Sequence, residues 1–244
     1  MEPYPRSTRA PISEPRPNWK SAPVFAFIAA LVALAALAAI ALRVPPRLVQ
    51  GLPDDPRARQ AREALAGNLE LGFDGLRFRS AMLGESGPVR PIAIVQEASA
   101  ARAESLMVEV LRRRPLDPLA YTALGSLALA RHRWREAEAR YRRALDLKAS
   151  CLEARLGLGV ALAERALIES DLSRARGLQL RAIAQFAAVT PAAECYPHAL
   201  FDRALLLTQV GRMDEARVWT ERYHALDPSS PWAARLADAA GPRR

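Results

Sequence analysis

The stretch from Tyr121 to Leu145, YTALGSLALARHRWREAEARYRRAL, decides the fold. Apolar and small residues recur in it at three- and four-residue intervals, on both sides of a short polar break at residues 131–133. An α-helix brings residues with that spacing onto one face. The positions concerned are Tyr121, Leu124, Gly125, Trp134, Ala137, Tyr141, Ala144 and Leu145. The stretch therefore predicts two helices joined by a tight turn.

This pattern resembles the tetratricopeptide repeat, a helix–turn–helix unit of about 34 residues. Small residues in that family let the two helices touch at the eighth, twentieth and twenty-seventh positions, where this chain has Gly125, Ala137 and Ala144. The family's larger residues between the helices are matched by Tyr121, Leu124 and Tyr141. The resemblance implies a stack of helix pairs that binds other proteins.

Further units surround this one. In the last unit, residues 211–216 resemble the family's turn, and Leu226-Asp227-Pro228 resembles its terminal stop. The unit between them exceeds the standard period by about eight residues, which we place around residues 167–173. A half-unit begins at Pro91, and a final helix from Ser230 to Gly241 is expected to cover the last apolar face. We expect an all-α, TPR-like α-solenoid over residues 91–244, with about three helix pairs.

The composition agrees with a helical protein that buries a core. Half of the 244 residues are apolar and a quarter are charged, while aromatic residues make up only 6%. Alanine, leucine and arginine favour helix over sheet. Two cysteines and three histidines exclude a disulfide scaffold and leave little material for a metal site. The net charge of +9 comes without a groove-reading motif, so we expect no nucleic acid partner.

An apolar run near the N-terminus suggests a membrane segment. Residues 24–42 carry no charged or polar side chain, which is enough helix to cross a bilayer core. We expect a tail at residues 1–22 and a single transmembrane helix at 23–43; a cleaved signal peptide is the alternative. Small residues at four-residue spacing would let this helix pack against another in lipid. They are Ala26, Ala29, Ala30, Ala33, Ala35 and Ala39.

The expected location follows from that segment. Positive charges are equal in number on the two sides of the run, so they do not fix its orientation. A short tail before one span and a large domain after it favours a cytoplasmic N-terminus. We therefore expect a single-pass protein of a bacterial inner membrane, with the solenoid in the periplasm. Residues 44–90 are expected to form a linker with one short helix, starting at Asp55-Pro56, and an irregular extended segment.

No enzyme signature is present. The sequence lacks a Gly-rich phosphate loop, His-Glu-x-x-His, Gly-x-Ser-x-Gly and Cys-x-x-Cys. We therefore expect no catalytic residues, no cofactor, no metal and no small-molecule substrate. The two cysteines, Cys151 and Cys195, stand at similar junctions between units. They could pair in an oxidising compartment, or remain two buried thiols if the junctions lie too far apart.

The resemblance also implies a binding groove, lined by the first helix of each unit. Carried onto this sequence, the groove positions are Leu119, Thr122, Ser126 and Leu129, then Glu153, Leu156, Val160 and Ala163, then His198, Phe201, Leu205, Thr208 and Gln209. This lining is apolar with small polar breaks, which suits an amphipathic helix or an extended apolar segment. The alternative is that these side chains pack against neighbouring units and hold no ligand.

Together these features predict a membrane-anchored scaffold with protein and lipid contacts. The first version is an accessory subunit that docks on or stabilises a larger membrane protein complex. The alternative is a periplasmic assembly chaperone that binds a peptide segment of a client, of the kind found in cytochrome c maturation, pilus or envelope-polymer export.

Overall fold

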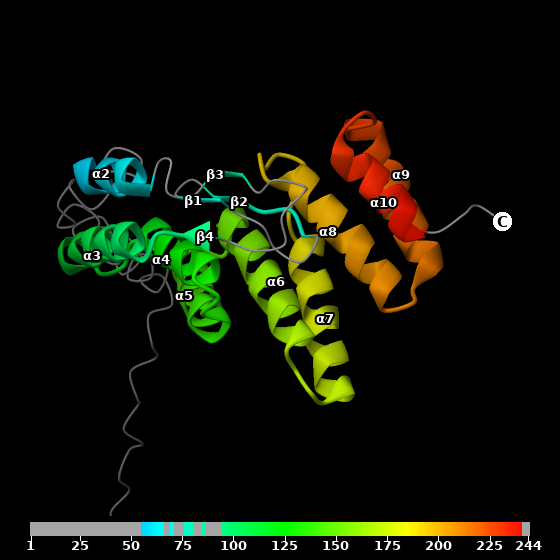
Figure 1. The fold of residues 1–244 in the computed structure, drawn as a ribbon, viewed down its shortest axis with the longest axis horizontal. Coiled ribbons are helices and arrows are strands. Elements are labelled where there is room, and N and C mark those ends of the chain that lie inside the picture. Colours follow the sequence, from blue (N-terminus) through cyan, green and yellow to red (C-terminus); the bar gives the residue numbers. More distant parts are fainter. Residues whose placement is uncertain (1–54, 66–68, 71–75, 81–83, 86–93, 241–244) are drawn as a thin grey trace, which may run out of the picture. The chain divides into compact units, whose positions relative to one another are not determined.

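The computed structural model describes residues 55–65, 69–70, 76–80, 84–85 and 94–240. All of them belong to one compact unit, Val49–Arg244. The helices are α2 (Pro56–Leu65), α3 (Glu97–Arg113), α4 (Pro118–Ala130), α5 (Trp134–Leu147), α6 (Leu152–Leu167), α7 (Leu172–Ala187), α8 (Tyr196–Gln209), α9 (Met213–Leu226) and α10 (Pro231–Ala240). Successive helices pack against each other along the chain, and α10 covers α8 and α9 (Figure 1). The expected all-α stack of helix pairs is thus present.

Helix caps explain several of the helix starts. The Asp117 side chain accepts hydrogen bonds from the backbone N–H groups of Leu119 and Ala120, at 2.9 and 3.3 Å, and Pro118 follows it at the first helical position. Asp171 caps α7 in the same way through the N–H of Arg174, at 2.9 Å. These bonds satisfy donors that the first helical turn leaves free.

Glycines allow the helices of a pair to touch. A Cβ built on Gly125 of α4 would lie 2.8 Å from the Tyr141 ring of α5, and one on Gly159 of α6 would lie 2.3 Å from the Phe186 ring of α7. A Cβ built on Gly157, which belongs to the next helix pair, would lie 2.2 Å from the same Tyr141 ring. Tyr141 therefore fills a space lined by glycines from two successive units, as the sequence pattern predicts for the first of them.

The long unit differs from the prediction in where its extra residues lie. Helices α6 and α7 have 16 residues each, whereas α4 has 13 and α5, α8 and α9 have 14. Part of the extra length thus lies in the two helices and part in the connection at residues 188–195, while the turn at residues 168–171 stays short. The α6–α7 hairpin consequently extends beyond its neighbours (Figure 1).

Short strands occur in the segment that we expected to be irregular. Strand β1 (Leu69–Glu70) pairs antiparallel with β4 (Ile94–Val95), and β2 (Arg79–Ser80) pairs antiparallel with β3 (Gly84–Glu85). Helix α2 starts where the sequence predicts and shares a core with α3 and with α4, formed by residues such as Ala61, Met107 and Leu124. A second core runs from α4 to α10 and includes Leu76 and Phe78.

Two expectations need correction, namely the membrane helix in the fold class and the inner-membrane location. Among the described residues, no helix combines the length and apolar character needed to cross a bilayer. The longest, α3, has 17 residues and carries charge along its length, as a helix with one buried face does. The fold class is therefore an all-α repeat stack, and a single-pass inner-membrane protein with a periplasmic solenoid is not supported. Residues 23–43, with their spaced alanines, lie outside the described residues.

Candidate functional site

The predicted groove positions lie on one face, formed by α4, α6 and α8, which we call the first-helix face. Most of their side chains are buried. The buried ones are Thr122, Ser126, Leu129, Leu156, Val160, Ala163, His198, Phe201 and Leu205. Leu119, Glu153 and Thr208 are half-buried, and Gln209 is exposed. Most of this face is thus covered rather than open to a partner.

A segment from far upstream in the sequence contributes to that cover. Phe78 is fully buried and Leu76 is 2% exposed, and both belong to the core that contains Leu129, Leu156 and Phe201. The Ser80 hydroxyl donates a hydrogen bond to the Ser126 hydroxyl of α4 at 2.9 Å, and β2 contacts α6. Residues 76–80 thus lie on the first-helix face in extended form, where the sequence predicts a partner peptide.

Arg77 anchors this segment to the C-terminal helices. Its backbone N–H donates to Oδ1 of Asp202 in α8, and its guanidinium donates to the Tyr223 hydroxyl and pairs with Asp227 at 3.5 Å. The guanidinium also lies over the rings of Trp232 and Tyr223, with its central carbon 5.3 and 5.7 Å from their centroids. Arg77 is therefore held by hydrogen bonds, by an ion pair and by contact with two aromatic rings.

We call the groups around Arg77, namely Asp202, Tyr223, Asp227 and Trp232, the Arg77 seat. Burial has the largest effect on the pKa values of its titratable groups. Asp202 is fully buried, and desolvation raises its pKa well above the usual value, although the backbone N–H and the charge of Arg77 oppose that shift. Burial also raises the pKa of Tyr223 to about 12. Burial alone would raise the pKa of Asp227, but hydrogen bonds from the Tyr223 and Ser230 hydroxyls and the charge of Arg77 lower it overall.

The family resemblance supplies the positions of this face, but sequence reasoning missed the segment that lies on it. Leu76, Phe78 and Ser80 alternate with Arg77 and Arg79. This two-residue alternation is typical of a half-buried strand and is the one signal that could have marked them. Asp202, Tyr223 and Trp232 carried no local motif, because they come together only when α8, α9 and α10 pack.

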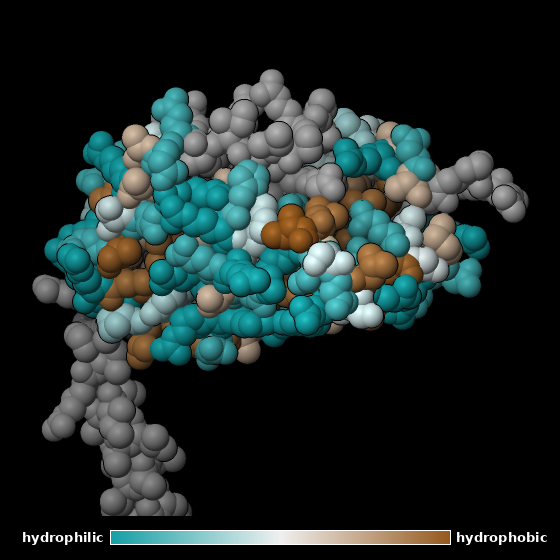
Figure 2. Space-filling view, turned by 60° about the horizontal axis from the view of Figure 1, so that its bottom comes forward, coloured by the Kyte–Doolittle hydropathy of each residue, from teal (hydrophilic) through white to brown (hydrophobic). Residues whose placement is uncertain are grey.

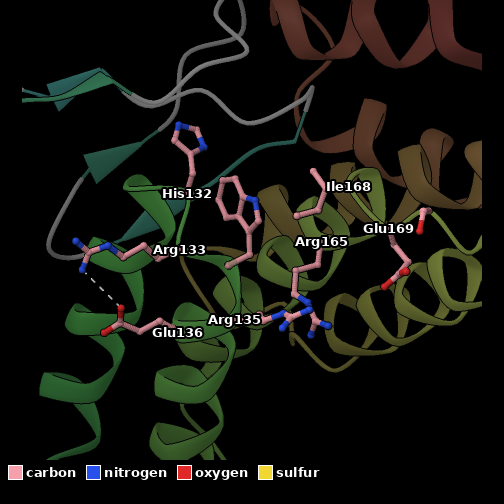
Figure 3. Close-up of a pocket in the computed structure, with 9 residues that line it drawn as sticks. His132, Arg133, Arg135, Glu136, Arg165, Ile168 and Glu169 are labelled. Carbon is pink, nitrogen blue, oxygen red and sulfur yellow. Dashed lines mark ion pairs between the residues drawn. The ribbon is translucent and has the colours of Figure 1, made fainter.

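A second candidate surface lies at the end of the α6–α7 hairpin. Leu167, Ile168 and Leu172 are exposed there by 51, 73 and 84%. An adjoining pocket is lined by His132, Arg133, Trp134, Arg135, Glu136, Arg165, Ile168, Glu169 and Ser170. Figure 3 shows Arg133 and Glu136 turned toward each other at one side of it, as an ion pair of 3.7 Å, with Ile168 and Glu169 at the other. Apolar patches interrupt an otherwise mostly hydrophilic surface (Figure 2).

The arginine-rich helix α5 is tied to the following unit by a buried carboxylate. Glu138 is 4% exposed and pairs with Arg142 of its own helix, with Arg165 of α6 and, at 3.3 Å, with Arg181 of α7. The four-residue spacing of Glu138 and Arg142 indicates only the first of these pairs. Glu138 therefore links two repeat units in addition to pairing along α5.

Comparison with known structures identifies the architecture. A crystal structure of a thermophilic TPR protein from Thermus thermophilus matches at a TM-score of 0.51 and 20% identity, over 59% of this chain and 76% of that one. The fold is tetratricopeptide-like. No family model matches the sequence, and no curated protein matches it. At this identity, the likeness extends to the fold of the TPR-like domain alone.

The remaining predicted features concern cysteines and metals. Cys151 and Cys195 are both buried, and no disulfide joins them in the structure. Burial raises the pKa of Cys195 to about 11, since a thiolate is poorly solvated there. Over the described ranges, no three His, Cys, Asp or Glu side chains gather as a metal site.

Proposed function

We propose that this chain is a non-catalytic scaffold for protein–protein interaction, and that it acts as an accessory subunit docking on a larger complex. The TPR-like fold supports binding as its class of function. The observation that carries the accessory role is the end of the α6–α7 hairpin, where Leu167, Ile168 and Leu172 are exposed. Grouped exposed apolar side chains mark interaction surfaces in folded proteins.

The surroundings of this surface define the partner that it suits. Arg133, Arg135 and Arg165 stand around the adjoining pocket against Glu136 and Glu169, so cationic groups outnumber the carboxylates. A partner surface with apolar side chains flanked by acidic ones complements both features. Docking at this end leaves the covered first-helix face undisturbed.

Affinity purification of the tagged chain tests this function. A double variant, Ile168→Asp with Leu172→Asp, places two charges in the proposed contact, and Leu226→Asp is the matched control because Leu226 is 55% exposed at the end of another helix, α9. We expect the parent chain and the control to retain a stoichiometric partner that the double variant loses. A parent chain that purifies as a free monomer contradicts the accessory role, and equal recovery with all three chains contradicts the docking surface.

A second function is an assembly chaperone that binds an extended client segment on the first-helix face. The observation in its favour is that this face holds residues 76–80 in extended form. Charged substitutions at Leu156 or Phe201 do not test it, because both side chains are fully buried and their replacement would unfold the domain. A test of this function must instead change residues 76–80, which lie on the first-helix face.

A further inference from the structure

The Asp202 carboxylate offers more hydrogen-bonding capacity than the segment on it uses. Asp202 is fully buried, and its Oδ1 accepts the N–H of Arg77 at 2.6 Å. Its other oxygen, Oδ2, has no hydrogen-bond partner among the residues that the structure describes. A buried polar atom without a hydrogen-bond partner destabilises the fold. Arg77 therefore occupies this site, but one oxygen of Asp202 lacks a hydrogen bond.

The contacts of residues 76–80 define a ligand pattern. The two apolar side chains, Leu76 and Phe78, enter the core, and the arginine between them meets Tyr223, Asp227 and Trp232. This seat combines carboxylates with aromatic faces, which a guanidinium matches better than an ammonium does. The groups that recognise the segment lie on α8, α9 and α10, so another chain with the same pattern meets them only after residues 76–80 leave.

Side-chain contacts and the chain connection, rather than extensive strand pairing, keep this segment in place. Strand β2 pairs with β3 through two residue pairs, Arg79 with Glu85 and Ser80 with Gly84. So short a ladder adds little stability of its own. A segment of the same chain competes at an effective concentration on the order of millimolar, so a partner segment displaces it only by matching these contacts.

We propose that residues 76–80 are an intramolecular ligand, and that the first-helix face exchanges them for an extended segment of a partner protein carrying an arginine between two apolar residues. This inference rests on the second function above and gives it a ligand class. A partner segment that also forms a hydrogen bond with Oδ2 of Asp202 would satisfy this carboxyl group better than residues 76–80 do.

A synthetic peptide tests the exchange in the full chain. The probe is a fluorescently labelled peptide of residues 75–81, GLRFRSA, and the receptor is the triple variant Leu76→Ala, Arg77→Ala, Phe78→Ala. We expect the triple variant to bind the peptide at least about tenfold more tightly than the parent chain, whose seat is already filled. The matched control is the same peptide with Glu in place of Arg77, which should not bind.

Each outcome decides the proposal. Circular dichroism first establishes whether the triple variant folds. If it folds and does not bind the peptide, or binds the Glu-containing peptide equally well, the proposal is wrong. If it folds only partly, adding the parent peptide should restore its helical signal and its melting transition, and failure to restore them also overturns the proposal. The α6–α7 variants keep residues 76–80 unchanged, so the docking test can fail or succeed independently.

Discussion

The backbone N–H of Arg77 donates a hydrogen bond of 2.6 Å to Oδ1 of Asp202, and 125 residues of sequence separate the two. This bond joins the segment before the repeats to α8, which is the first helix of the last helix pair. Together with the bond from Ser80 to Ser126 in α4, it sets residues 76–80 across the first-helix face. The segment thus belongs to the folded core of the TPR-like domain.

Replacing Phe78 tests that membership. Phe78 is fully buried, so Phe78→Ala removes its packing and leaves a cavity, at a cost of about 3–5 kcal/mol in the free energy of unfolding. Urea unfolding followed by circular dichroism measures the loss. Leu226→Ala is the control, because that side chain is 55% exposed and its truncation should cost less than about 0.5 kcal/mol. Equal stability of the two variants would show that Phe78 does not pack in the core.

The pH dependence of stability should change when Asp202 is replaced by a residue that does not titrate. Because burial raises its pKa in the folded chain, the folded state holds this proton where the unfolded state has released it, and stability falls as the pH rises above the unfolded value of about 3.9. Asp202→Asn keeps an oxygen to accept the N–H of Arg77 but does not titrate. We expect the melting temperature of Asp202→Asn, relative to that of the parent chain, to increase as the pH rises toward neutrality.

Measuring both melting curves from about pH 5 to about pH 8 checks this expectation, since the comparison cancels titrations that the two chains share. Arg77 and Glu164 are the charges that act on Asp202, with opposite effects on its pKa. A constant difference between the two chains over this range would mean that Asp202 titrates normally in the fold.

Glu138 should matter more than its neighbour on the same helix. Glu138→Ala removes the carboxylate that joins Arg142, Arg165 and Arg181, at a cost of about 1–2 kcal/mol, because these arginines can turn to solvent once it is gone. Glu136→Ala is the matched control, since its pairs with Arg133 and Arg140 lie on the surface and contribute about 0.3–0.5 kcal/mol each. Urea unfolding of both variants measures the two costs, and a Glu138 variant as stable as the control would show that the three-arginine contact does not link the units.

The cysteines should behave as protected thiols. A pKa of about 11 at Cys195 leaves little thiolate near neutral pH, so its reaction with a thiol reagent should be slower than that of a free cysteine by about two orders of magnitude. Denaturant should expose both Cys151 and Cys195 to rapid reaction. Titration before and after unfolding checks this, and recovery of fewer than two thiols in the unfolded, unreduced chain would reveal a disulfide.

The repeat architecture could be predicted from sequence because its signals are local. The small residue Gly125 and the ring of Tyr141 lie on paired helices joined by a tight turn, and the sequence spacing alone brings them together. The positions that we assign to the first-helix face come from the family resemblance, carried over residue by residue. Asp117 marks the start of α4 through its own backbone contacts.

The occupation of that face could not be predicted in the same way. The contact between Arg77 and Asp202 depends on how an extended segment returns over helices far along the chain, and no periodicity encodes that return. The buried carboxylate of Glu138 was missed for a related reason. Its spacing to Arg142 is visible in the sequence, whereas Arg165 and Arg181 reach it only once α6 and α7 pack.

Alanine substitutions at two glycines, Gly157 and Gly177, distinguish the effect of packing on stability from the effect of helix propensity. Gly157→Ala would place a methyl group 2.2 Å from the ring of Tyr141, which is itself fully buried, so the ring or the helix must shift. Such overpacking costs about 1–3 kcal/mol. Gly177 lies within α7 and has nothing within 4 Å of an added Cβ. There, Gly177→Ala should stabilise the fold by about 0.5–1 kcal/mol, because alanine favours helix.

The opposite signs of these two changes make the pair a sharp test of the stacked arrangement. Both residues sit inside helices, and both receive the same methyl group, so helix propensity acts alike on the two variants. Only contact with the preceding unit, through Tyr141, sets Gly157 apart. Thermal and urea unfolding of the two single variants and their double variant should give additive effects. A Gly157→Ala chain that is stabilised as much as the Gly177→Ala chain would show that α6 does not pack on Tyr141 of α5.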